Sequence, residues 1–75
     1  MNKDYIYIKE DGVMEVHIDG VLYEYKVEDF KIVDDKNIVE KDRVLEALDT
    51  AEFMHNYRID NNLEVWNTHV VTMSR

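Results

Sequence analysis

The chain contains two Asp-Gly dipeptides, Asp11-Gly12 and Asp19-Gly20, and they separate three runs of residues that favour β-strands. Asp-Gly between two such runs is a strong signal for a β-hairpin, because both residues tolerate a positive φ angle. The sequence holds no other glycine. The pattern therefore predicts a three-stranded antiparallel meander, with strands over Tyr5–Lys9, Val13–Ile18 and Val21–Val27.

The second turn fits a two-residue loop, so that Ile18 pairs with Val21 across it. In this register one face of the sheet becomes almost continuously apolar. Its residues on the second and third strands are Met14, Val16, Ile18, Val21, Tyr23, Tyr25 and Val27. A slip by one residue would turn one strand's side chains to the wrong face, and so the hydrophobic pattern selects this register.

The first turn is predicted to be longer than the second. A two-residue loop there would bury Lys9 and turn two isoleucines outward. A three-residue loop, Glu10-Asp11-Gly12, instead pairs Ile8 with Met14 and buries both isoleucines. It also puts Gly12 in the left-handed position that a bulged turn of this kind requires. Because burying an unpaired charge is unfavourable, the three-residue loop is preferred.

The opposite face of the meander carries three rows of side chains. The rows are Tyr5–His17–Leu22, Tyr7–Glu15–Glu24, and Lys9 near Lys26. One interpretation is an ordinary outer surface, on which tyrosine is common because it favours strands, or a face covered by later parts of the chain. The other interpretation is a surface that binds a partner.

After the meander the sequence predicts a short fourth strand over Phe30–Val33, with Phe30 and Ile32 facing inward. A turn over Asp34–Asn37 follows. A helix is then predicted from Lys41 to about Tyr57, because apolar residues recur at helical spacing. The stripe that faces the sheet consists of Val44, Leu48, Ala51 and His55.

The start and the continuity of this helix rest on two further patterns. Asn37 and Glu40 resemble a capping box at its start. Asp49 and Glu52 form a second possible box, at which the helix could break into two pieces. One helix is favoured, because the apolar stripe continues in phase across Asp49.

Phe53 and Tyr57 lie off the apolar stripe, on a side of the helix that they share with Glu46, Asp49 and Thr50. In one interpretation the two rings pack against each other or against a strand edge. In the other they form an aromatic anchor for a partner. The sequence leaves both interpretations open.

The C-terminal part predicts a last strand over Leu63–Val71, after a helix end at Asn61 and Asn62, which suit left-handed backbone. Both faces of this strand are partly apolar, which indicates cover on both sides or an interface. Residues 1–4 are expected to be a frayed start and residues 72–75 a tail. The fold class is therefore α+β in one domain over residues 1–75: an antiparallel β-meander of three to four strands, one helix packed on one sheet face, and a C-terminal strand.

Charge and composition narrow the classes of function. The net charge at pH 7 is −8 and there is no basic patch, so direct binding to nucleic acid or to an anionic membrane is not expected. The chain has no cysteine, which excludes disulfides and thiolate chemistry. Its N-terminus lacks the apolar region of a signal peptide and begins with Met, which favours a complete, cytoplasmic protein.

No pattern typical of a catalytic, metal or phosphate site stands out. His17, His55 and His69 lack the spacing of a metal motif, and neither glycine lies in a loop of the phosphate-binding kind. Glu15 and Glu24, predicted to be cross-strand neighbours, are the one acid–base candidate, because adjacent carboxylates can raise a pKa. Because the sequence predicts neither a nucleophile nor a cleft, it favours a protein that is not an enzyme and uses no cofactor.

The remaining class is a protein that acts through its surface. A strong negative field steers association with the opposite sign, so the expected partner is a protein with a basic surface. The prediction is an inhibitor or adaptor, whose short, acidic, cysteine-free profile is similar to that of phage-encoded antagonists of host or bacterial defence enzymes and of immunity proteins. Its carboxylates either imitate the charge of nucleic acid or only keep the chain soluble. The candidate partner-binding residues are Tyr5, Tyr7, Glu15, His17, Leu22, Glu24, Phe53 and Tyr57.

Two alternatives stay open beside this prediction. A self-assembling accessory protein would form a homodimer through a strand edge or through packing of exposed faces. A small-ligand-binding module would use Trp66 and the tyrosines. The mass of the native protein bears on the first alternative, and quenching of Trp66 fluorescence by a ligand bears on the second.

Overall fold

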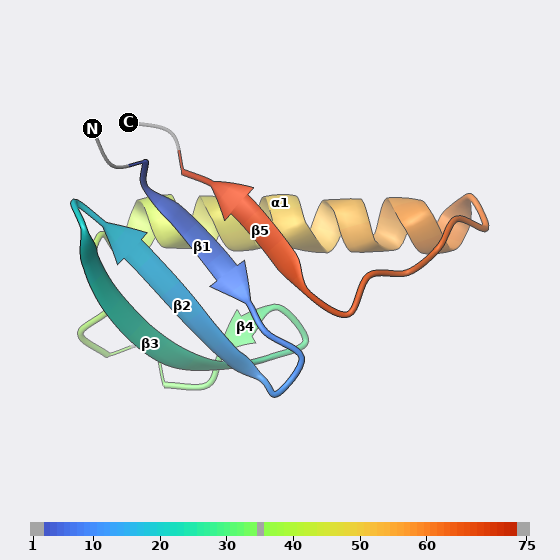
Figure 1. Ribbon diagram of the computed structural model, residues 1–75. Helices are drawn as coiled ribbons and strands as arrows, with labels where there is room; N and C mark the ends of the chain where they lie inside the picture. The colour runs from blue at the N-terminus through green and yellow to red at the C-terminus, as the bar shows by residue number, and fades with distance from the viewer. Residues whose placement is uncertain (1–2, 35, 74–75) are drawn as a thin grey trace.

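The computed structural model describes residues 3–34 and 36–73, which form a five-stranded antiparallel sheet and one helix (Figure 1). The elements are β1 (Tyr5–Ile8), β2 (Val13–Ile18), β3 (Val21–Glu28), β4 (Lys31–Ile32), α1 (Lys41–Asp60) and β5 (His69–Thr72). Their order across the sheet is β4-β3-β2-β1-β5, so the last strand pairs with the first. The predicted α+β fold, a β-meander with a helix and a C-terminal strand, is confirmed.

Both predicted hairpin registers are confirmed. Ile8 pairs with Met14 and Ile18 with Val21. In the first turn Gly12 has a φ of +87°, and the Lys9 N–H donates to the Val13 carbonyl oxygen at 2.9 Å. The three-residue loop thus places a glycine where another residue would be strained.

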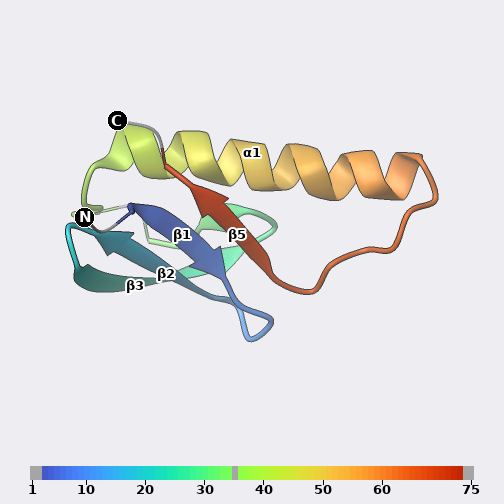
Figure 2. The ribbon, with the colours of Figure 1, turned by 45° about the horizontal axis from the view of Figure 1, so that its top comes forward.

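The core lies between the inner face of the sheet and α1, which crosses behind the sheet in Figure 1 and lies above it in Figure 2. The buried apolar residues are Ile6, Ile8, Met14, Val16, Ile18, Val44, Ala47, Leu48, Ala51 and Met73. Burial of each large side chain stabilises the fold by about 1.5–3 kcal/mol. Cover of the inner face weakens on β3, where Val21 and Tyr23 remain exposed, because α1 packs mainly against β5 and β1.

The start of α1 differs from the prediction. Asn37 and Glu40 both have left-handed backbone, with φ of 60° and 43°, and Glu40 makes no capping hydrogen bond. A capping residue needs extended backbone for its side chain to reach back to the helix N–H groups, so the predicted box is wrong. Glu40 instead accepts a hydrogen bond from Arg43 at 2.8 Å.

The rest of the helix follows the prediction closely. It is one helix, unbroken at Asp49, and it ends at Asp60, slightly beyond the expected Tyr57. Asn62 takes the left-handed conformation expected there, with a φ of 56°. The buried stripe ends at Ala51, since His55 is only half-buried.

The two short strands differ from their predicted extents. The fourth strand is only β4, because Phe30 lies in a turn with a φ of 62°, although Phe30 and Ile32 do pack against the core as expected. The last strand begins at His69 and not at Leu63. Its neighbour β1 ends at Ile8, beyond which the chain turns into the first hairpin, so residues 63–68 find no ladder partner in β1.

Residues expected at the frayed ends are part of the fold. Asp4 is 3% exposed and Met73 is 5% exposed. The Met73 N–H donates to the Asp4 carbonyl oxygen at 2.9 Å, which continues the ladder between β1 and β5. Residues 1–2 and 74–75 of the expected ends, and residue 35 of the expected turn, lie outside the described residues.

The C-terminal part of α1 extends beyond the sheet. A helix of 20 residues is about 30 Å long at about 1.5 Å per residue. Figures 1 and 2 both show its far end projecting past the strands, with residues 61–68 returning from there to β5. In the described part of the chain, no helix combines the length and the apolar character needed to cross a membrane.

Candidate functional site

The candidate residues predicted from the sequence fall on two separate surfaces. Tyr5, Tyr7, Glu15, His17, Leu22 and Glu24 share the outer face of the sheet, in the predicted rows. Phe53 and Tyr57 lie on α1, about half a turn away from the buried stripe and therefore on the side that faces away from the sheet. The core lies between the two surfaces, so one flat partner surface cannot contact both.

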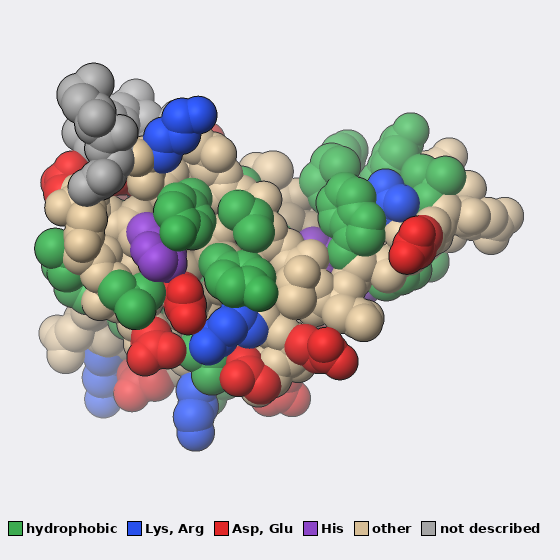
Figure 3. Space-filling view, viewed as in Figure 1, with side chains coloured by type: hydrophobic (Ala, Val, Ile, Leu, Met, Phe, Trp, Pro, Cys, Tyr) green, Lys and Arg blue, Asp and Glu red, His purple; other side chains and the backbone are tan. Residues whose placement is uncertain are grey.

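On the outer face of the sheet the side chains interact mainly with one another. The rings of Tyr5 and His17 stack with centroids 4.2 Å apart and planes 11° apart. His17 Nε2 lies 3.1 Å from a Glu15 oxygen. Lys9 Nζ lies 3.3 Å from Glu15 and 3.9 Å from Glu24, so it bridges the two facing carboxylates. Figure 3 shows this face with apolar, acidic, basic and histidine side chains intermixed.

The pKa of Glu15 is lowered, first by its hydrogen bond with His17 and then by Lys9. The pKa of Lys9 is raised, chiefly by its hydrogen bond with Glu15. A general acid at this position would need a raised carboxyl pKa. His17 and Lys9 therefore lower the pKa of Glu15, which is opposite to the raised pKa expected for an acid–base candidate.

The outer sheet face also presents apolar side chains and one shallow depression. Tyr5 and Tyr7 are half-buried, while Leu22 exposes 50% and Val70 of β5 exposes 66% of its surface. An open depression of about 340 Å³ lies at one end of this face and is lined by Lys3, Tyr5, His17 and Gly20. The charged groups at the centre of this surface, Glu15, Glu24 and Lys9, are already paired.

The outer face of α1 has a different character. Phe53 and Tyr57 stack with ring centroids 6.4 Å apart, which confirms that they pack against each other. Phe53 nevertheless exposes 65% of its surface and Tyr57 exposes 48%. Helical periodicity places Asp42, Glu46 and Asp49 on the same face. Among the described residues, no ion pair neutralises these three carboxylates.

These three carboxylates are not among the candidate residues predicted from the sequence. The signal that identifies Glu46 and Asp49 was present, since the helix periodicity already grouped them with Phe53 and Tyr57. Asp42 needed the position of the helix start, because it occupies the first turn of α1. We call the surface formed by Asp42, Glu46, Asp49, Phe53 and Tyr57 the outer helix face.

A cluster of rings lies where the projecting part of α1 meets β5. His55 and His69 are 5.6 Å apart between ring centroids, and Phe30 lies 5.2 Å from each. Arg58 stacks over the ring of Trp66 at 4.1 Å. The pKa of His69 is lowered, first by burial and then by the neighbouring His55. The described residues contain no group of three or more potential metal ligands.

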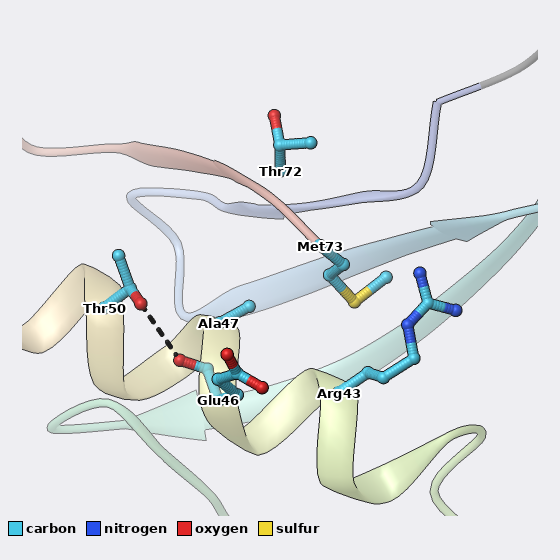
Figure 4. Close-up of a pocket in the computed structure, with 6 residues that line it drawn as sticks. All are labelled: Arg43, Glu46, Ala47, Thr50, Thr72 and Met73. Atoms are coloured by element: carbon cyan, nitrogen blue, oxygen red, sulfur yellow. Dashed lines mark hydrogen bonds between the residues drawn. The ribbon is translucent and has the colours of Figure 1, made fainter. Parts of the chain in front are cut away.

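The hollow between α1 and the end of β5 is smaller than a usual pocket for a small ligand. It has a volume of about 170 Å³ and is lined by Arg43, Glu46, Ala47, Thr50, Thr72 and Met73 (Figure 4). Pockets for small ligands usually measure about 300–1,000 Å³. Arg43 reaches Asp4 and Glu40, each at 2.8 Å, and these hydrogen bonds raise the pKa of its guanidinium.

Comparison of the chain with protein-family models, with curated proteins and with solved structures found no match.

Proposed function

We propose that this chain is a small acidic protein-binding module, an inhibitor or an adaptor, that binds a protein with a basic surface through its outer helix face. The observation that carries the proposal is one helix face that combines an exposed, stacked aromatic pair with a row of unpaired carboxylates. None of these side chains belongs to the hydrophobic core.

The aromatic pair supports a role at the centre of an interface. Aromatic side chains bury about 150–250 Å² each and are enriched among the residues that dominate binding energy. The stack of Phe53 on Tyr57 holds both rings in place before a partner arrives. Because ordering of side chains opposes binding, this pre-organisation favours association.

The carboxylates support a partner with a basic surface. Asp42, Glu46 and Asp49 follow one another along the helix axis at rises of about 6 Å and about 4.5 Å. No ion pair links them to a described basic side chain, whereas Lys9 lies between the two carboxylates of the outer sheet face. A groove lined with lysine and arginine is complementary to such a row.

A groove that normally holds nucleic acid is one surface of this kind. A chain that occupied it would act as an inhibitor, and the proposal extends to a phage-type antagonist of a host or bacterial defence enzyme. An adaptor would instead leave the activity of its partner intact. An activity assay on the identified partner separates these two roles.

The proposal is tested by capturing partners from bacterial lysate on the immobilised chain, once at about 0.1 M salt and once at about 1 M salt. Between these two concentrations the Debye length falls from about 10 Å to about 3 Å, so electrostatic attraction is screened at the higher one. We expect a basic protein that is retained at low salt and released at high salt. The variant Glu46→Lys/Asp49→Lys should fail to retain it.

The matched control is Glu10→Lys/Glu28→Lys, which changes the net charge equally at two exposed sites off the helix. It should retain the partner. Equal loss with both variants would mean that net charge alone drives the capture. Retention by the helix-face variant would contradict the proposal outright.

A further inference from the structure

Strand β5 leaves one side of its backbone open. The Met73 N–H donates to the Asp4 carbonyl oxygen of the β1 side at 2.9 Å. In an antiparallel ladder, successive residues direct their N–H and C=O groups alternately toward the neighbouring strand and away from it. Val70 and Thr72 therefore direct these groups away from β1, and in the described part of the chain the sheet ends at β5.

The sequence around this edge carries no charge. Residues 65–74 contain no Asp, Glu, Lys or Arg, and this is the longest such run in a chain that is 35% charged. Natural edge strands are usually protected from pairing by charged residues, proline or bulges. β5 has none of these protections, and Val70 at its centre exposes 66% of its surface.

The opposite edge of the sheet is protected. The same alternation directs the backbone groups of Leu22, Glu24 and Lys26 of β3 outward, and the Lys26 carbonyl oxygen accepts the Val33 N–H at 2.9 Å. β4 covers the end of β3, and two of these outward positions are charged. The two edges of one sheet therefore differ, and only the β5 edge lacks charge.

From this difference we infer that β5 is a dimerisation edge, at which β5 of a second copy of this chain adds in antiparallel orientation. Antiparallel pairing of a strand with itself is two-fold symmetric, so each copy uses the β5 edge, the opposite edge of the described sheet is protected, and growth stops at two. This inference goes beyond the proposed function and does not depend on it.

Charge points to a second copy as the occupant. Two molecules that each carry a charge of −8 repel one another over most of their surface. The uncharged β5 edge is the place where their backbones can approach closely without bringing carboxylates together. The β3 edge would place Glu24 of one copy near Glu24 of the other.

The size of the contact sets its strength. A four-residue strand alone buries less than the roughly 800 Å² per partner of a standard interface. Leu63, Val65 and Trp66 come shortly before the strand in the sequence and expose 42%, 45% and 43% of their surfaces, and we expect them to add apolar area to the contact. We therefore expect a dimer that dissociates in the micromolar range.

Amide hydrogen exchange of the wild-type chain, followed by NMR, tests the pairing residue by residue. At about 500 µM the Val70 and Thr72 amides should exchange about five- to ninefold more slowly than at about 5 µM, because mass action favours a dimer with a micromolar dissociation constant. The Val71 amide, which faces β1, is the internal control and should be protected at both concentrations.

Two variants test the same edge by native mass. Val70→Pro removes an outward N–H without removing a bond to β1, and Val70→Lys adds the missing charge. Both should be monomers of 9.0 kDa under conditions in which the wild-type chain is a dimer. Leu22→Lys, an equally drastic change at an exposed apolar position of β3, should remain dimeric.

Retention of the fold is checked by circular dichroism for each variant. A wild-type chain that is monomeric at about 500 µM would overturn the inference. A dimer that survives both Val70 substitutions and is lost with Leu22→Lys would also overturn it, and would assign dimerisation to the outer sheet face.

Discussion

Gly12 allows the three-residue turn that connects β1 and β2. Its φ of +87° is accessible to glycine, and the nearest atom to an added Cβ would be the Val27 carbonyl oxygen at 3.5 Å, an ordinary contact. The penalty for another residue is therefore backbone strain and not a clash.

We predict that Gly12→Ala lowers the free energy of unfolding by about 1–2 kcal/mol, because an L-residue is strained in the left-handed region. Urea denaturation followed by circular dichroism measures the loss. Gly12→Asn is the control and should lose less, since asparagine tolerates this conformation. An equal loss for both variants would indicate that the cause is not the φ angle.

His69 makes stability depend on pH. Burial and His55 lower its pKa in the folded chain relative to the usual value of about 6.5. Between the two pKa values the unfolded chain binds more protons, so the free energy of unfolding decreases as pH falls below about 6.5.

We expect the melting temperature to fall between about pH 7.5 and about pH 5.5, a window above the range in which ordinary carboxylates titrate. His69→Leu should flatten this part of the profile, because it removes the titrating group from the site. Thermal melts of both proteins at matched pH values measure it. An unchanged slope in the variant would show that another group is responsible.

At the scale of the element, α1 has one face that stabilises the fold and one that does not. Leu48 is 1% exposed within the core, whereas Leu45 on the same helix is 38% exposed. The two leucines differ in packing but not in chemistry or in helix propensity, so they form a matched pair.

We predict that Leu48→Ala lowers the free energy of unfolding by about 2–4 kcal/mol, through lost burial and the cavity that remains. Leu45→Ala should lower it by less than about 1 kcal/mol. Chemical denaturation of the two variants side by side measures the difference. Similar losses would contradict the position of the buried stripe.

The elements that could be predicted from the sequence are those that local chemistry determines. The Asp-Gly turns and the period-two pattern fix the hairpin registers, and the helical period fixes the stripe from Val44 to Ala51. The left-handed backbone of Glu40 and the short β5 could not be predicted, because they depend on tertiary contacts. β5 in particular is limited by where its neighbour β1 ends at Ile8.

The candidate site was predictable only in part, for the same reason. The rows on the outer sheet face follow from the register of the two hairpins. The pairing of Lys9 with two carboxylates instead depends on the conformations of its own long side chain and of the two glutamates. Phe53 and the outer sheet face lie on opposite sides of the core because of how α1 packs on the sheet. No local sequence pattern specifies this packing.

At the scale of the whole molecule, the structure has two wide faces of different character. The outer sheet face is a mosaic in which charges and rings pair internally, and the outer helix face presents stacked rings beside unpaired carboxylates. The β5 edge lies at the side of the sheet and belongs to neither of these faces.

Matched truncations of one exposed apolar residue on each wide face distinguish which face binds the protein partner. The measurement is the dissociation constant of the captured partner for Phe53→Ala and for Leu22→Ala, two residues that are 65% and 50% exposed. We predict that Phe53→Ala weakens binding by about 10- to 100-fold, as loss of an aromatic anchor does. Leu22→Ala should change it by less than about twofold. The reverse order of effects would show that the outer helix face is not the interface and would assign the interface to the outer sheet face.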